Sequence, residues 1–300
     1  MGINRYPPPP REYFRHLPVR GDAPDLGVEV GSWVYRLEGL DPALGASLEA
    51  HYRPFITSAR REGCHRVRVL EGGVDHFLPP DETSRPRIHP LTLDWEGNLL
   101  KIRSYGFVGW ISLEESEGEM ALARSGYERG EWSVENYLRV CTAWKAVREG
   151  GVLLHGASLV RSGRAWVFMG PSGSGKSTLA AISRAGKVVS DDLTLIRRSP
   201  SGFRVEATPF RGTYQGGEPV KGSFPVGGIC RILQNVENRL SPCPSNHAVA
   251  NLLASSPFVV DQLERSPEIL VNLKTLTATH PVTYLHFSLD GDFWDVLRDS

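Results

Sequence analysis

Residues 170–177 constrain the fold of this chain more than any other segment. They read Gly-Pro-Ser-Gly-Ser-Gly-Lys-Ser, which matches the phosphate-binding loop G-x-x-x-x-G-K-[ST]. The apolar run 165–169 before the loop predicts a buried strand, and a helix is expected from Thr178 onward. Strand, loop and helix in this order are what the motif requires, so the sequence predicts an α/β nucleotide-binding domain.

The chemistry of the motif gives each part of the loop a role. Its glycines let backbone N–H groups turn inward and surround a polyphosphate. Lys176 places a positive charge on the β- and γ-phosphates, and Ser177 offers a hydroxyl to Mg²⁺. The helix that follows directs its N-terminus at the anion. The predicted nucleotide-binding residues are Gly170, Ser172, Gly173, Ser174, Gly175, Lys176, Ser177 and Thr178.

The amino-acid composition limits the number of domains and the kinds of binding partner that we expect. The chain has 300 residues, 40% of them hydrophobic and 23% charged, which suits two modest domains or one large one. The formal net charge is zero, which gives no electrostatic argument for nucleic-acid binding. Only six lysines occur, so a lysine inside the loop carries more weight as evidence.

The cysteines and the apolar runs indicate the cellular compartment of the protein and whether it binds zinc or a membrane. The four cysteines are scattered without metal-ligand spacing, which predicts free thiols and no zinc site. The N-terminus has no apolar signal region, and no apolar run reaches the length of a membrane span. We therefore expect a cytoplasmic protein with no membrane partner.

The sequence suggests four parts. Residues 1–24 form a Pro-rich arm, which we expect to be a stiff, poorly ordered leader, with binding to a partner's aromatic groove as the alternative. Residues 25–130 read as a small α+β domain. Its signals are a helix that starts at Asp41-Pro42 and a hairpin formed by residues 91–95 and 99–102.

A linking helix is expected over residues 131–150. Apolar residues recur three or four positions apart along it, and the Gly150-Gly151 pair ends it. Residues 151–300 then form the domain with the phosphate loop. We expect a mixed sheet there, with strands at 152–160, broken at Gly156, and at 165–169, 187–190, 193–197 and 284–289. Helices are expected near 248–253 and 259–263.

An acidic pair follows the next predicted strand. Asp191 and Asp192 follow Ser177 after an interval of thirteen residues, at a strand end where α/β proteins bind ligands. One carboxylate would hold Mg²⁺ and the other would accept a proton from an attacking hydroxyl. The alternative is a turn that merely closes the strand.

Two further residues are candidates for the same site. His155 lies on the strand before the hairpin that leads into the loop, where it would face the phosphate or the acceptor; a structural histidine is the alternative. Arg211 lies in a loop rich in proline and glycine. Its two interpretations are stabilisation of phosphoryl charge and ordinary surface charge.

The ordered set of motifs resembles a known family. Leu154-His155-Gly156, residues 170–178, Ser190-Asp191-Asp192 and Arg211-Gly212 are similar to the C-terminal kinase domain of HPr kinase/phosphorylase and its relatives. That family shares a core with phosphoenolpyruvate carboxykinase. The resemblance extends over about residues 150–215 and is more specific than the loop alone.

The resemblance implies an α/β P-loop kinase domain with a mixed sheet, preceded by the small α+β domain. It implies ATP and Mg²⁺ as cofactors and transfer of the γ-phosphoryl group to a serine hydroxyl. By this match Asp191 would be the general base, Ser177 and Asp192 would serve the metal, His155 would line the acceptor side and Arg211 would contact phosphate.

The acceptor is the least constrained part of this hypothesis. The leading half is similar to that of HPr-kinase-related proteins, some of which phosphorylate serine in ribosomally made peptides. A peptide or protein serine is therefore the preferred acceptor, and relatives of this kind often form homo-oligomers. The alternatives are a small-molecule kinase and a non-catalytic nucleotide-binding module.

Overall fold

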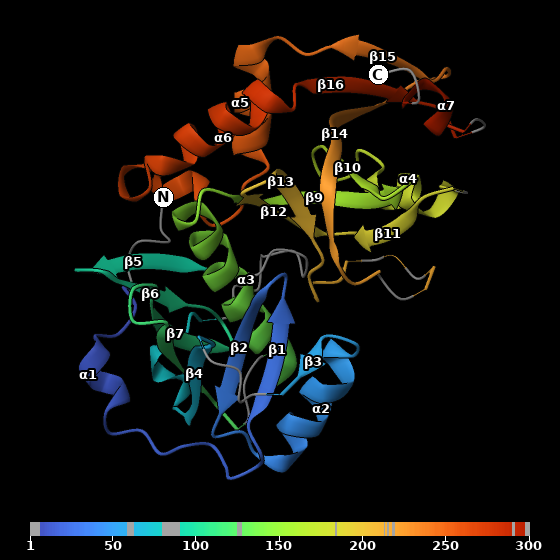
Figure 1. Ribbon diagram of the computed structural model, residues 1–300. Coiled ribbons are helices and arrows are strands. Elements are labelled where there is room, and N and C mark those ends of the chain that lie inside the picture. The colour runs from blue at the N-terminus through green and yellow to red at the C-terminus, as the bar shows by residue number, and fades with distance from the viewer. Residues whose placement is uncertain are drawn as a thin grey trace. The chain divides into compact units, whose positions relative to one another are not determined.

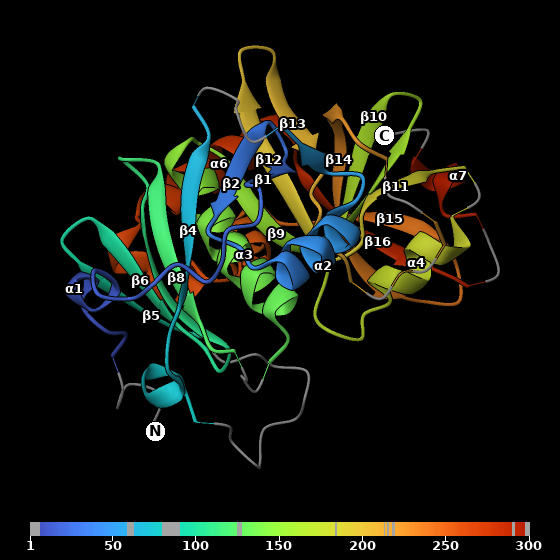
Figure 2. The same ribbon diagram turned by 90° about the horizontal axis from the view of Figure 1, so that it is seen from below.

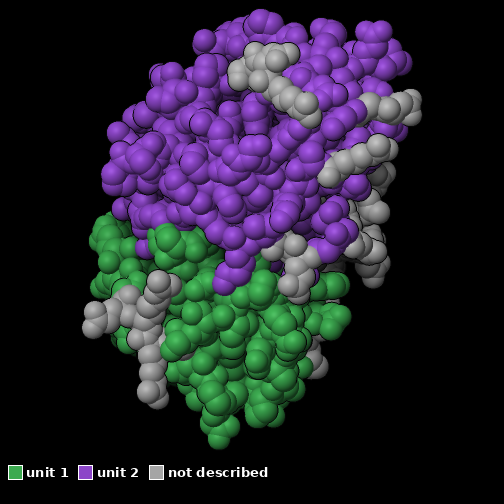
Figure 3. Space-filling view, turned by 45° about the vertical axis from the view of Figure 1, so that its right-hand side comes forward, with its two compact units in different colours: residues 1–141 green, residues 142–300 purple. Residues whose placement is uncertain are grey.

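The structure is a computed structural model that describes residues 7–58, 63–79, 91–124, 128–183, 185–212, 214, 216–217, 220–289 and 292–297. Its chain is a mixed α/β protein with two large sheets and few helices (Figure 1). It divides into two compact units, Met1–Cys141 and Thr142–Ser300, which Figure 3 colours green and purple. The division falls inside α3 (Gly130–Arg148), the helix that the sequence predicts over 131–150.

Unit 1 is built on an eight-stranded mixed sheet. The pairs β2–β4 and β4–β8 are parallel and the others are antiparallel. In spatial order the strands are β3 (Ile56–Thr57), β1 (Leu26–Val30), β2 (Trp33–Glu38), β4 (His65–Glu71), β8 (Glu117–Leu122), β7 (Phe107–Ser112), β6 (Leu99–Arg103) and β5 (Thr92–Glu96).

The helix α2 (Pro42–Tyr52) begins where its sequence predicts. The side chain of Asp41 accepts a hydrogen bond from the backbone N–H of Leu44 at 2.9 Å, and Pro42 occupies the first turn. The residues Leu44, Leu48 and Tyr52 lie four apart and are buried. This face packs against the sheet, and the helix runs beside β1 (Figures 1 and 2).

The Pro-rich arm is part of unit 1. Pro8 and Pro9 are buried, and the Arg103 guanidinium donates a hydrogen bond to the carbonyl of Pro7 at 3.4 Å. The short helix α1 (Arg11–Phe14) follows, and its Phe14 is buried in a cluster with Leu70, Trp110 and other apolar residues. The expectation of a poorly ordered leader is therefore wrong for residues 7–14, because these apolar side chains have a core to enter.

Unit 2 is built on a second eight-stranded mixed sheet. Its strands are β9 (Val152–Arg161), β10 (Arg164–Met169), β11 (Lys187–Ser190), β12 (Leu193–Ser199), β13 (Gly202–Glu206), β14 (Ser223–Gln234), β15 (Arg239–Pro242) and β16 (Val282–Phe287). The spatial order is β10-β9-β12-β13-β14-β16-β15, and β11 pairs with β9. Because β10 also pairs in parallel with β14, the strands β9, β12, β13, β14 and β10 close into a ring.

The strand β9 runs without interruption through Gly156, where the sequence predicted a break. A Cβ atom on Gly156 would lie 2.9 Å from the carbonyl oxygen of Phe168 on β10. The glycine therefore serves the close approach of two paired strands and does not end the strand.

After the end of α3, short helices accompany the sheet in the described part of unit 2. They are α4 (Lys176–Ile182), α5 (Ser245–Ala254), η3 (Val260–Arg265), α6 (Glu268–Thr279) and α7 (Trp294–Leu297). Leu179 of α4 and Trp294 of α7 are buried in one cluster with Phe168, Leu285 and Phe287 from the sheet. Among the described residues, no helix is both long and apolar enough to span a membrane.

Candidate functional site

The phosphate-loop segment joins β10 to α4. Gly173 and Gly175 have φ angles of 79° and 99°, a region that favours glycine. A Cβ atom on Gly175 would lie 2.7 Å from the ring of Phe287, and one on Gly170 would lie 2.6 Å from the hydroxyl of Ser174. The loop backbone therefore has a shape and a packing that only glycine permits at these positions.

Lys176 is held over this loop. Its ammonium group donates to the carbonyl oxygens of Gly170 at 2.9 Å and Pro171 at 3.1 Å. Burial lowers the pKa of Lys176, and the nearby carboxylate of Asp192 opposes that shift. The positive charge is thus positioned at the loop and close to the acidic pair.

The loop offers the donors that a polyphosphate requires. Among the described residues, the hydroxyl of Ser174 is a buried polar atom with no hydrogen-bond partner. Ser177 is half-buried, and Ser172 and Thr178 are exposed. Backbone N–H groups, hydroxyls and one ammonium group suit the oxygens of a nucleotide triphosphate.

A magnesium ion would also find suitable atoms here. The Ser177 hydroxyl and the carboxylates of the acidic pair are oxygen donors, the kind that Mg²⁺ prefers. In the part of the chain that the structure describes, no group of three or more His, Cys, Asp or Glu side chains is placed to hold a metal. An ion held mainly by substrate phosphates would need only one or two of these oxygen donors from the protein.

Asp191 is buried and has backbone partners for both of its oxygens. Its Oδ1 accepts from the N–H of Gly212 at 3.0 Å, and its Oδ2 accepts from the N–H of Tyr214 at 2.8 Å. A Cβ atom on Gly212 would lie 2.7 Å from Oδ2 of Asp191, so the contact requires glycine. Asp191 therefore fixes the segment that begins with Arg211.

Asp192 lies beside the other predicted site residues. Its Oδ1 is 3.6 Å from Nε2 of His155, and its carbonyl oxygen accepts from the N–H of Gly156 at 2.9 Å. The pairing of β12 with β9 sets this arrangement, because it places Leu193 opposite His155. Both side chains are partly exposed, at 22% for Asp192 and 43% for His155.

The structure thus brings most of the predicted residues together. Asp192 lies beside His155, its charge opposes the lowering of the Lys176 pKa, and Asp191 accepts a hydrogen bond from the residue after Arg211. The side chain of Arg211 is exposed.

Several supporting contacts were not identified from the sequence. The hydroxyl of Thr194 donates to the Gly156 carbonyl at 2.8 Å, and that of Ser190 donates to the Leu193 carbonyl at 2.8 Å, which braces the turn with the acidic pair. Phe287 and Gln234, at the ends of β16 and β14, lie against Gly175. The contacts of Thr194 with Gly156 and of Gly175 with Phe287 and Gln234 join segments that are distant in the sequence, so no local pattern marks them.

Comparison with known proteins gives a family match. A family model described as "SynChlorMet cassette protein ScmC" matches residues 133–299, and no curated protein matches the chain. The match extends over more than half of the chain and includes the loop, the acidic pair, His155 and Arg211. The chain therefore belongs to the family of the SynChlorMet cassette protein ScmC.

Proposed function

We propose that this protein is an ATP-dependent kinase with an HPr-kinase-like P-loop domain, which transfers the γ-phosphoryl group to a serine hydroxyl of a peptide or protein. A ribosomally made precursor peptide is the preferred acceptor. The observation that carries the proposal is the position of Asp192, whose carboxylate is 3.6 Å from the His155 ring and acts on the charge of Lys176 in the loop. Phosphoryl transfer needs a charge clamp and a proton acceptor side by side.

The loop would bind the triphosphate. Lys176 would exchange its two carbonyl partners for phosphate oxygens, which compensates for its partial burial. The Ser177 hydroxyl would hold Mg²⁺ together with the phosphate oxygens. Bound there, the ion would neutralise charge that builds up on the phosphates during transfer.

The two acids then have different roles. Both oxygens of Asp191 accept backbone hydrogen bonds, so we assign Asp191 to positioning Gly212 and Tyr214. Asp192 is partly exposed and adjoins His155, so we assign the proton-accepting role to Asp192, where the sequence had suggested Asp191. The serine oxygen forms a bond to the γ-phosphorus, its proton goes to Asp192, and the bond to the leaving ADP oxygen breaks.

A phosphotransfer assay tests the proposal. Wild-type protein and Lys176→Ala are incubated with Mg²⁺, ATP labelled in the γ-phosphate and a panel of serine-containing peptides, each with a matched Ser→Ala peptide. We expect label on a serine peptide, none on its alanine partner and none with Lys176→Ala, with mass spectrometry locating the phosphate. ATP binding without transfer to any peptide would instead indicate a binding module or a small-molecule kinase.

A further inference from the structure

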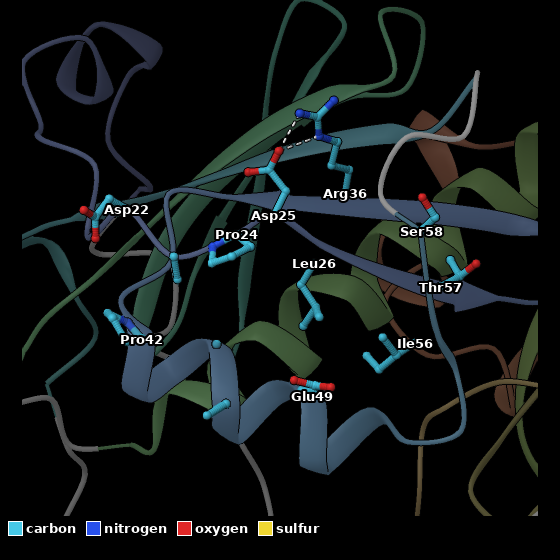
Figure 4. A pocket seen from close by; sticks show the side chains of 13 residues that line it. Asp22, Pro24, Asp25, Leu26, Arg36, Pro42, Glu49, Ile56, Thr57 and Ser58 are labelled. Carbon is cyan, nitrogen blue, oxygen red and sulfur yellow. Dashed lines mark hydrogen bonds and ion pairs between the residues drawn. The ribbon is translucent and has the colours of Figure 1, made fainter.

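Unit 1 contains an open groove, remote in sequence from the phosphate loop. It has a volume of about 950 Å³ and lies between α2 and the strands β1, β2 and β3 (Figure 4). The segment 22–25 closes one side. All the lining residues belong to unit 1, so the groove is complete within that unit.

The groove exists because one face of α2 carries small side chains. Pro42, Gly45, Ala46 and Glu49 recur at helical spacing and line the groove, while the buried apolar face of α2 lies elsewhere on the helix. Opposite them, Leu26 and Ile56 contribute partly exposed apolar surface (Figure 4). A helix with small residues on this face leaves room that larger side chains would fill.

The groove is acidic. Three carboxylates line it, from Asp22, Asp25 and Glu49, against the single guanidinium of Arg36. Arg36 is already engaged, since it bonds to Asp25 at 3.0 Å and pairs with Glu38 at 3.0 Å. Among the described residues, Asp22 and Glu49 make no ion pair, and both are exposed. The net negative charge therefore faces solvent.

We propose that this groove binds an extended peptide segment that carries lysine or arginine beside apolar side chains. Apolar side chains would cover Leu26 and Ile56, and the cations would pair with Asp22 and Glu49. Only the identification of this peptide as the phosphoryl acceptor rests on the proposed kinase function; the binding itself does not. The groove then supplies a recognition site separate from the acceptor serine.

Fluorescence anisotropy tests the proposal on the full chain without nucleotide. The probe is a fluorescein-labelled peptide of alternating lysine and leucine, and its counterpart has glutamate in place of lysine. We expect saturable binding of the lysine peptide only, weakened by salt because exposed charges are screened. The double variant Asp22→Lys/Glu49→Lys should raise the dissociation constant by more than about tenfold.

Two matched controls separate the groove from general charge and from folding. Glu264→Lys changes an exposed acid in unit 2 and should leave binding unchanged. Ala46→Trp should fill the groove and block binding, while Ala50→Trp, exposed on the same helix but outside the groove, should not. Thermal melting verifies that each variant is folded.

The outcomes distinguish this proposal from the kinase proposal. Three results would overturn the groove proposal. The wild type and the double variant could bind the lysine peptide equally, Glu264→Lys could weaken binding as much as the double variant does, or the lysine peptide could show no saturable binding. Lys176→Ala should retain full peptide binding while it loses phosphoryl transfer. Loss of phosphoryl transfer with intact peptide binding therefore concerns only the kinase proposal. Loss of peptide binding with intact phosphoryl transfer concerns only the groove proposal.

Discussion

At the scale of single residues, the acidic pair shows which features of the site the sequence could predict and which it could not. The motif order identified Asp191 and Asp192 as site candidates. The structure places Asp192 beside His155, where its charge acts on Lys176, and places Asp191 against the backbone of Gly212. The sequence could not show which carboxylate has which role, because the side chains of neighbouring residues in one turn point in different directions. The assignment depends on which carboxylate meets the backbone of Gly212 and Tyr214.

The contrast between the two acids can be measured with isosteric variants. We expect Asp192→Asn to bind ATP normally and to lose phosphoryl transfer by about a hundredfold or more, since the amide cannot accept the proton. Asp191→Asn turns an acceptor into a donor that faces a backbone N–H, so it should loosen the contacts with Gly212 and Tyr214.

Hydrogen exchange and kinetics distinguish the two effects. The amides of Gly212 and Tyr214 should exchange faster in Asp191→Asn than in the wild type, and at the wild-type rate in Asp192→Asn. Wild-type transfer rates in Asp192→Asn would show that another group accepts the proton. Unchanged exchange in Asp191→Asn would remove its positioning role.

At the scale of elements, local sequence patterns predicted a helix or a hairpin correctly where they agree with the residues that the structure buries. The helix α2 and the hairpin β5–β6 lie where their capping and turn residues predict, with Gly97 at a φ angle of 60° in the turn. The helix α6 was missed, because Val271 and several threonines favour a strand. Its Ile269, Leu273 and Leu276 are buried at helical spacing, and tertiary packing decides the outcome.

The short helix α4 depends on packing for its position. Its Leu179 is fully buried against the sheet, while Ala181, two residues further along the helix, is exposed. We expect Leu179→Ala to lower the free energy of unfolding of unit 2 by about 2–5 kcal/mol, measured by denaturant titration. Ala181→Ser should change that free energy by less than about 0.5 kcal/mol. A small effect of Leu179→Ala would mean that α4 is not anchored by this contact.

At the scale of the whole molecule, sequence indicated a mixed α/β chain but not its strand connections. The parallel pair β10–β14 joins residues that are about sixty positions apart, and it closes the ring that supports the loop. Long-range pairing of this kind depends on the surfaces of both strands, so it cannot be predicted from the sequence of either strand alone. The groove of unit 1 was missed for the same reason, because its walls come from four separate segments.

The central claim is that the loop at residues 170–177 binds a nucleotide triphosphate. Calorimetric titration of a magnesium complex of a non-hydrolysable ATP analogue into the wild type and Lys176→Ala tests it most directly. We expect one saturable site per chain in the wild type and a dissociation constant raised by more than about tenfold in the variant, which loses a charge-assisted contact. Equal affinity in both proteins, or no binding by the wild type, would contradict the account.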